Sequence, residues 1–287
     1  MKICAVNKLI GSLLVVLCVV CGTVSAWGAD VASVTVNGTT TNYTSFSSAW
    51  TAANAATAEA AITLLQDISG VGMLTYSNTQ NCTLNLNGHV LTSNATQAAL
   101  YITGNVTFTV TDGSENKEGK IGIVATHDMN AYGVLVSKGH FVLKAGTIEA
   151  HLPASTSQGI RVAKGASFTM NGGTIEVETT NSQNGDGVFA NTSATATING
   201  GEIHVRAAAT GYAVNVAGTT TITGGKFSAS GTSSACVYKA ANGTLTLQGG
   251  YYSANTNLAA NCATNYHVFP NSDATYLHKV AEGYTLT

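Results

Sequence analysis

One short motif, with apolar residues alternating on both sides of a small-residue corner, occurs five times between Phe141 and Tyr252. The copies read FVLKAGTI, FTMNGGTI, ATINGGEI, TTITGGKF and LTLQGGYY. Their second glycines are Gly146, Gly173, Gly201, Gly225 and Gly250, which are spaced by 27, 28, 24 and 25 residues. A repeat of this length, with strand-like alternation around a glycine, is typical of a β-solenoid.

Alternate residues of a strand face the same side, so the apolar residues of each copy are predicted to line a common interior. Ile175, Ile198, Ile203 and Ile222 are among those that we expect to be buried and stacked. A third strand is predicted upstream of each corner, at 133–136, 159–162, 187–190, 213–216 and 236–239. Three strands per coil indicate an all-β fold, a parallel β-helix, and right-handed winding is the default for parallel crossovers.

The ends of the chain depart from this repeat. We divide the chain into a signal peptide (1–26), a small α/β N-terminal cap (27–72), a parallel β-helix (73–265) and a C-terminal capping segment (266–287). The N-terminal cap is predicted as strand, helix and strand, at 34–36, 46–55 and 61–65, with Ser45 as the helix N-cap. The C-terminal cap is predicted from segments 266–269 and 275–277. Solenoids need such atypical ends to cover their core.

Several segments resemble a known family. They are ITLLQD at 62–67, LNLNGH at 84–89, VTFTVTD at 106–112, the Gly-Gly repeats, and the tail from GGYYS at 249–253 to AEGY at 281–284. Together they resemble secreted parallel β-helix repeat proteins of gut bacteria, which have a pectate-lyase-like architecture. The resemblance implies the fold and secretion. It implies no single activity, because such repeats occur in adhesins, glycan-binding proteins and enzymes.

The N-terminus and the composition limit the location and the partners. Lys2 and Lys8, an apolar segment at 13–20 and the small residues at 24–26 predict a cleaved signal peptide, and an uncleaved anchor is the alternative. We therefore expect a secreted or bacterial cell-surface protein with no membrane span in the mature chain. Charged residues make up 9% and the net charge is −2, which argues against a nucleic-acid partner.

Three cysteines, Cys82, Cys236 and Cys262, remain after the predicted cleavage. An odd number excludes a complete disulfide framework. Cys236 and Cys262 are about one coil apart, so two interpretations stay open: a bridge between coils, or buried and inert thiols. No Cys-x-x-Cys pair remains after the predicted cleavage, and we assign no metal and no cofactor.

The first candidate surface is a Thr-x-Thr face before the glycine corner. It contains Thr195, Thr197, Thr219 and Thr221. One interpretation is that threonine is simply a good exposed strand residue that pairs with itself across strands. The alternatives are a glycan or surface-contact face, or an ice-binding-like lattice.

The second candidate surface follows the corner and is rich in acids and bases. Besides Glu149 and His151 it contains Glu176, Glu178, His204 and Arg206. Paired carboxylates beside a base could serve glycosidic chemistry, and a His/Glu cluster could hold a metal. The alternative is a solvated face with cross-coil pairs, Glu178 with Arg206 and Glu176 with His204.

The third candidate surface is a line on the upstream strand, made of Leu135, Arg161, Phe189, Asn215 and Tyr238, with Tyr132 and Tyr212 nearby. Aromatic side chains in a groove stack on sugar rings, or else they pack beneath the loops at 151–158 and 178–186. Pectinolytic β-helix enzymes use clustered aspartates, whereas Asp67, Asp112, Asp128, Asp186 and Asp273 are scattered here. We therefore expect a non-enzymatic module that binds a polysaccharide or cell-surface glycan. A carbohydrate-active enzyme, a lyase or glycoside hydrolase, is the rival.

Overall fold

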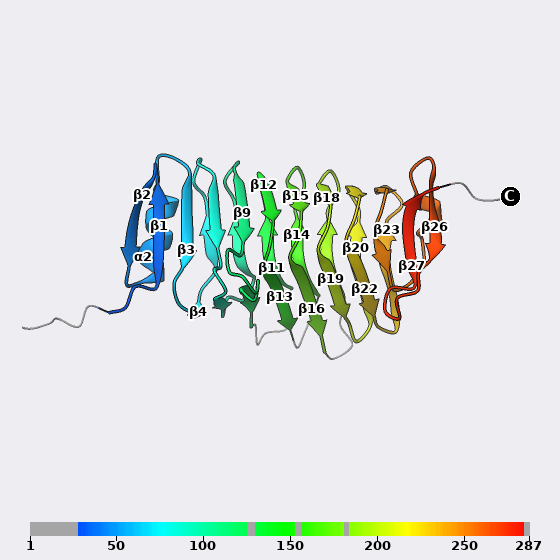
Figure 1. Cartoon of the computed structure of the whole chain (residues 1–287), viewed down its shortest axis with the longest axis horizontal. Helices are drawn as coiled ribbons and strands as arrows, with labels where there is room; N and C mark the ends of the chain where they lie inside the picture. The colour runs from blue at the N-terminus through cyan, green and yellow to red at the C-terminus, as the bar shows by residue number, and fades with distance from the viewer. Residues whose placement is uncertain (1–27, 125–129, 153–155, 181–183, 284–287) are drawn as a thin grey trace, which may run out of the picture.

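The chain forms an elongated stack of parallel coils. The computed structural model describes residues 28–124, 130–152, 156–180 and 184–283, and the predicted signal peptide lies outside these ranges. The N-terminal cap lies at one end of the stack and the strands of the C-terminal segment at the other (Figure 1). The strands form three sheets, of ten, ten and seven strands. Each complete coil supplies one strand to each sheet, which gives about seven turns.

Sheet A carries the strands that precede the glycine corners. Its order is β2 (Thr39–Tyr43), β1 (Ala32–Val36), β3 (Ala60–Leu64), β6 (Cys82–Asn85), β9 (Thr107–Thr111), β12 (His140–Leu143), β15 (Ser167–Met170), β18 (Thr195–Ile198), β21 (Thr219–Ile222) and β24 (Thr244–Leu247). The strands from β3 onward pair in parallel.

Sheet B carries the strands that follow the corners. Its order is β26 (Tyr266–Pro270), β27 (His278–Glu282), β25 (Tyr251–Tyr252), β22 (Lys226–Ser230), β19 (Glu202–Arg206), β16 (Thr174–Thr179), β13 (Thr147–Leu152), β10 (Lys120–Ile123), β7 (Val90–Ser93) and β4 (Ile68–Val71).

Sheet C closes each coil and contains the third predicted strand. Its order is β23 (Ser233–Lys239), β20 (Thr210–Val216), β17 (Gly185–Ala190), β14 (Ser157–Val162), β11 (Ala131–Val136), β8 (Ala98–Ile102) and β5 (Leu74–Tyr76). The prediction of an all-β parallel solenoid with three strands per coil is therefore confirmed. The right-handed winding stays a prediction.

The interior is lined as the alternation of apolar residues predicts. Ile175, Ile198, Ile203 and Ile222 are each 0% exposed. Ile175 lies opposite Ile203 in sheet B, and Ile198 lies opposite Ile222 in sheet A. Because a shift of one residue would expose every one of these side chains, their burial fixes the register of the coils.

The glycine corners are required by the close approach of successive coils. Gly173 has φ +78, and a Cβ atom placed there would lie 2.6 Å from the carbonyl oxygen of Gly146 in the preceding coil. Both the left-handed backbone and the contact exclude a side chain at this position. The repeat of glycine along the chain thus reflects the stacking of the corners.

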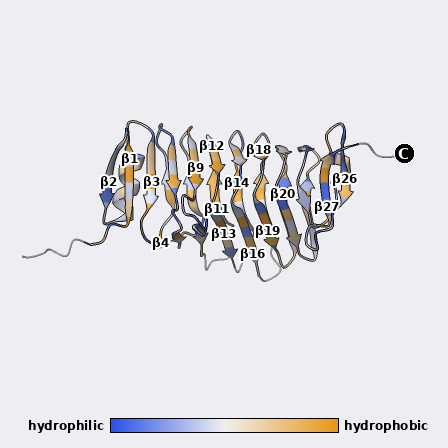
Figure 2. Cartoon of the chain, viewed as in Figure 1, coloured by the Kyte–Doolittle hydropathy of each residue, from blue (hydrophilic) through white to orange (hydrophobic). Residues whose placement is uncertain are grey.

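The N-terminal cap covers the first coil with a hairpin and a helix. Helix α2 (Phe46–Asn54) buries Phe46, Trp50 and Ala53, and Trp50 Nε1 donates a hydrogen bond to the Thr75 carbonyl at 3.1 Å. Ser45 occupies the N-cap position, but its side chain makes no capping hydrogen bond. Strand β1 pairs antiparallel with β3 and with β2. In Figure 2 the outermost strand β2 is hydrophilic, as expected for an end that faces solvent.

The C-terminal cap is an antiparallel hairpin, in which β26 pairs with β27 and β27 pairs with β25. A short 3-10 helix, η1 (Ala259–Asn261), precedes it. Of the two segments named for this cap, 266–269 lies in β26, whereas 275–277 precedes β27, which begins at His278. The carboxylate of Asp273 accepts hydrogen bonds from the backbone N–H groups of Thr275 at 2.7 Å and Tyr276 at 3.0 Å, which fixes a turn before β27.

The three cysteines of the described chain are free thiols. Cys82 and Cys236 are buried and Cys262 is half-buried, so the bridge between Cys236 and Cys262 is not formed. Burial raises the pKa of the Cys82 thiol to about 12, and it also raises the pKa of Cys262. These values favour inert thiols.

Candidate functional site

The outer face of sheet C brings together the predicted line of side chains and the two nearby tyrosines, Tyr132 and Tyr212. Two rows of side chains run across its strands. The first row is Tyr132, Gln158, Asp186 and Tyr212, and the second is Leu135, Arg161, Phe189, Asn215 and Tyr238. We call this surface the sheet C face.

A glycine between the two rows sets their spacing. Gly133, Gly159 and Gly187 occupy equivalent positions in β11, β14 and β17. A Cβ atom at Gly159 would lie 2.3 Å from Cγ2 of Ile175, so the strand passes too close to sheet B for any side chain. The two outward rows are therefore three residues apart, as in Tyr132 and Leu135, instead of the usual two.

Planar side chains stack along the sheet C face. The Arg161 guanidinium lies 5.4 Å from the ring centroid of Tyr132 and 5.0 Å from that of Phe189. Tyr212 and Tyr238 stack with centroids 4.6 Å apart and planes inclined by 14°. Such cation–π and ring contacts fix the orientation of the side chains.

Exposure increases along the face toward the C-terminal coils. Tyr132 is only 8% exposed and packs with Ala98, Leu135 and Tyr101. Phe189 and Tyr212 are half-buried, and Tyr238 is 39% exposed. The aromatic residues predicted for this face therefore differ: Tyr132 is packed against its neighbours, whereas Phe189, Tyr212 and Tyr238 are partly or largely accessible.

A polar network lies between the aromatic groups. Gln158 Nε2 donates to Asp186 Oδ2 at 2.8 Å, and Asn215 Nδ2 donates to Asp186 Oδ1 at 3.1 Å. Arg161 Nη1 donates to Gln158 Oε1 at 3.0 Å. Asp186 is 6% exposed. Burial raises the pKa of its carboxyl to about 6, against the lowering effects of Asn215, Gln158 and Arg161.

This network was not predicted from the sequence, in which Asp186 counts as one of several scattered aspartates. The signal was present in the repeat: Asp186 stands three residues before Phe189, as Tyr132 stands before Leu135 and Gln158 before Arg161. Equivalent positions in successive coils lie side by side. Aligning the third strands by their glycine would have placed Asp186 beside Gln158 and Tyr212.

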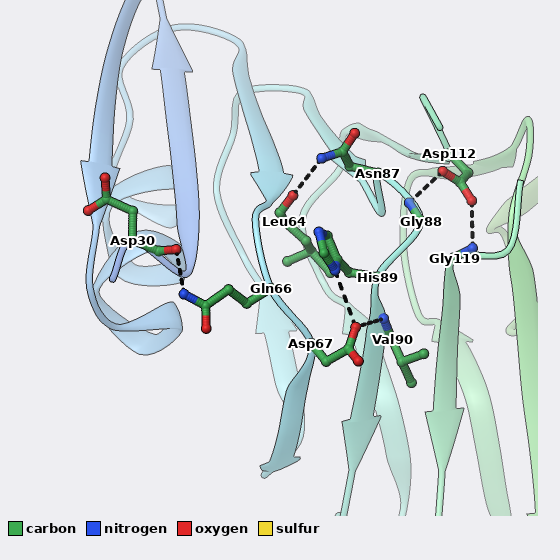
Figure 3. Close-up of polar contacts among 10 residues, drawn as sticks. All are labelled: Asp30, Leu64, Gln66, Asp67, Asn87, Gly88, His89, Val90, Asp112 and Gly119. Carbon is green, nitrogen blue, oxygen red and sulfur yellow. Dashed lines mark hydrogen bonds and ion pairs between the residues drawn. The ribbon is translucent and has the colours of Figure 1, made fainter. Parts of the chain in front are cut away.

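Two other aspartates hold turns, as Figure 3 shows. Asp112 accepts hydrogen bonds from the backbone N–H groups of Gly88 at 2.9 Å, Ser114 at 3.0 Å and Gly119 at 2.6 Å. These bonds outweigh burial and lower its pKa. Asp67 binds Val90 N–H at 3.0 Å and His89 Nδ1 at 3.2 Å, and both contacts lower its pKa. Asp67 and Asp112 therefore stabilise turns of the backbone.

The Thr-x-Thr face lies on the outside of sheet A in the predicted register. Thr195 lies opposite Thr219, and Thr197 lies opposite Thr221. Thr195 and Thr219 are exposed, and the other two are half-buried. At the corner next to this face, Asn199 Nδ2 donates to Asn171 Oδ1 at 2.8 Å, and Thr223 donates to Asn199 Oδ1 at 2.9 Å. The result is a regular polar wall.

The acid–base patch lies on sheet B, also in the predicted register. Arg206 Nη2 lies 3.3 Å from Glu178 Oε2, which confirms that pair. The predicted contact of Glu176 with His204 is wrong. His204 Nε2 instead contacts Glu202 Oε2 at 3.1 Å, and its Nδ1 contacts Ser228 Oγ at 2.8 Å. The imidazole thus joins Glu202 of its own strand to Ser228 of the next coil, although Glu176 is its direct register partner.

These features define a parallel β-solenoid with one aromatic and polar outer face, one threonine-rich face and one acid–base face. Comparisons with protein-family models, with curated proteins and with solved structures find no match for this chain. In the described part of the chain, no helix has the length and apolar character needed to span a bilayer. The chemistry of the three faces is therefore the basis for a functional proposal.

Proposed function

We propose that this protein is an extracellular binding module that recognises a polysaccharide or cell-surface glycan through the sheet C face. The observation that carries the proposal is the stack of Tyr212 on Tyr238, with Phe189 on the adjacent coil and the amide of Asn215 between them. Aromatic faces bind the apolar faces of sugar rings, and amide and carboxylate groups bind their hydroxyls. A ligand of several sugar units would follow the stack of coils.

The composition supports a neutral ligand. Only 9% of residues are charged, and the net charge is −2. A polyanion would need a basic surface, whereas Arg161 is engaged by Gln158 and by two aromatic rings. Neutral polysaccharides are therefore the preferred ligand class.

The location is part of the same proposal. The predicted signal peptide at 1–26 and the resemblance to secreted β-helix proteins of gut bacteria favour a secreted or cell-surface protein. Such a location would place the sheet C face in contact with glycans of other cells or of the medium. Detection of the chain in the culture medium or on intact cells, with Ala26 as the last residue removed, tests this part.

The first experiment is a screen of the purified chain against neutral and acidic polysaccharides, followed by calorimetry with the best ligand. Saturable binding to a neutral polysaccharide supports the proposal. Preferential binding to polyanions contradicts it, and so does the absence of binding to any glycan. If the ligand were an ice or mineral surface bound by the threonine face, Phe189→Ala together with Tyr238→Ala would leave the binding unchanged.

An enzymatic function is the second candidate, and one observation favours it. The carboxyl of Asp186 has a pKa of about 6, which suits a general acid near neutral pH. A reducing-sugar assay tests this candidate. Release of sugar that disappears in Asp186→Asn would assign a carbohydrate-active enzyme, whereas loss in Glu176→Gln or Glu178→Gln would move the chemistry to sheet B.

A further inference from the structure

A cluster of potential metal ligands lies on sheet B, apart from the sheet C face. Glu149 and His151 belong to β13, and Glu176 belongs to β16. Glu149 and Glu176 are directly opposite in the parallel register. One ligand atom from each of the three residues lies within 4.8 Å of the other two. We propose that these residues form a binding site for a divalent transition-metal ion.

The distances fit a coordination shell. His151 Nδ1 lies 3.3 Å from Glu149 Oε1. Ligand atoms that share a tetrahedral Zn²⁺ at bond lengths of about 2.0–2.2 Å are themselves about 3.3 Å apart. The ligand atom of Glu176 lies within 4.8 Å of the other two, and its side chain must move closer to complete the set. Three protein ligands would leave at least one position on the metal for water.

The opposite carboxylates of Glu149 and Glu176 concentrate negative charge at this place. Carboxylates directly opposite each other on neighbouring strands repel. Of the two, Glu149 is partly neutralised by Lys120, whose Nζ lies 3.2 Å from Glu149 Oε2. His151 Nδ1 lies 3.3 Å from Glu149 Oε1, whereas Nε2, on the other side of the ring, is shielded from solvent and has no hydrogen-bond partner among the described residues. A metal ion bound at Nδ1 would offset the repulsion between the two carboxylates, which Lys120 relieves only at Glu149.

The two carboxylate oxygens of Glu149 face different neighbours. Oε2 contacts Lys120 Nζ at 3.2 Å and lies beside Gly122 of β10, on the side away from Glu176, whereas Oε1 contacts His151. Arg206 forms an ion pair with Glu178 at 3.3 Å. Its charge is therefore directed to Glu178 and away from Glu149 and Glu176.

The donor set selects the class of metal. One imidazole nitrogen with two carboxylates favours Zn²⁺ and related first-row ions such as Co²⁺, Ni²⁺ and Cu²⁺ over Ca²⁺ and Mg²⁺, which prefer all-oxygen sites. The described cysteines are excluded as ligands, because Cys82, Cys236 and Cys262 are not among the clustered groups.

The test is titration of the purified chain with Zn²⁺ by calorimetry and with Co²⁺ by visible absorption. We expect one Zn²⁺ per chain, and a Co²⁺ spectrum without the intense near-ultraviolet band of a thiolate ligand. His151→Gln and Glu176→Gln should each weaken the affinity at least tenfold. Glu178→Gln and His204→Gln are matched controls on the same face and should change it less than twofold.

A second variant keeps the proposal testable if the ligand variants are unstable. Lys120→Gln removes the cation that now binds Glu149, and it should increase the affinity for Zn²⁺ severalfold. Loss of folding cannot produce such an increase. The proposal is overturned if Zn²⁺ does not bind at millimolar concentration, if His151→Gln binds it as the wild type does, or if the Co²⁺ spectrum contains a thiolate band.

Discussion

Tyr212 and Tyr238 stack in parallel across neighbouring coils, with ring centroids 4.6 Å apart. They occupy different rows of the sheet C face, since Tyr212 lies opposite Ala235 and Tyr238 lies opposite Asn215. The contact is therefore diagonal between the two rows. A rigid pair of rings with one exposed member is a surface on which a sugar ring can stack.

The first prediction compares this face with the threonine face. Phe189→Ala together with Tyr238→Ala should weaken polysaccharide binding at least tenfold, because each ring contributes about 1 kcal/mol or more of stacking and apolar contact. The measurement is calorimetry with the glycan found in the screen.

Thr197→Val together with Thr221→Val is the control for that experiment. A threonine hydroxyl mostly exchanges one hydrogen bond to water for another, so binding should change little. The opposite ranking of the two double variants would move the ligand to sheet A. Circular dichroism should confirm that both variants keep the solenoid.

The second prediction concerns the corners of the coils. Gly173→Ala should lower the free energy of unfolding by at least about 3 kcal/mol, because left-handed strain is added to a clash with the Gly146 carbonyl. Gly165→Ala is the matched control. Gly165 has φ +79, but a Cβ atom added there would meet nothing within 4 Å, so strain alone should cost about 1–2 kcal/mol. Equal losses in urea denaturation would show that the close approach of the coils does not matter.

The third prediction concerns the core. Ile198 is 0% exposed, so Ile198→Ala should cost about 2–4 kcal/mol through lost burial and a residual cavity. Thr197→Ala, on the outer side of the same strand, should cost less than about 1 kcal/mol. Chemical denaturation of both variants gives the comparison. A smaller loss for Ile198→Ala than for Thr197→Ala would contradict the assignment of the inner face.

The fourth prediction concerns pH. The carboxyl of Asp186 has a folded pKa of about 6, above its ordinary value of 3.8. The folded protein therefore binds this proton more tightly than the unfolded chain does. The contribution of Asp186 to the free energy of unfolding is fully present below pH 3.8 and is lost as the pH rises to about 6.

Asp186→Asn should remove that downward slope, as measured by urea denaturation between pH 4 and about 7. Asp273→Asn provides a contrast of opposite sign, because hydrogen bonds from the backbone N–H groups of Tyr276 and Thr275 lower the pKa of Asp273. Its contribution is present above its ordinary pKa and is lost as the pH falls. An unchanged slope in Asp186→Asn would show that this carboxyl is solvated.

The fifth prediction concerns the thiols. Cys82 and Cys236 are buried and Cys262 is half-buried. A water-soluble thiol reagent should label Cys262 slowly in the native protein and should reach Cys82 and Cys236 only after unfolding. Mass spectrometry of labelled peptides identifies the sites. Rapid labelling of native Cys82 would contradict its burial beneath the N-terminal cap.

The repeat by itself determined the architecture. The spacing of Gly146, Gly173 and Gly201 set the coil length, and the alternation around them set the inner face, since each coil meets the same steric conditions as its neighbours. The N-terminal cap was also predictable, because the helix at 46–54 has an apolar stripe and Ser45 before it.

The contacts between side chains of different coils were decided only by the tertiary structure. Sequence alone placed Glu176 beside His204 in register, yet the imidazole binds Glu202, because side-chain rotamers choose among several neighbours at similar distance. The burial of Asp186 and the proximity of Glu149, His151 and Glu176 likewise depend on stacking. A repeat defines which residues are adjacent, whereas packing defines which of them interact and how far water is excluded.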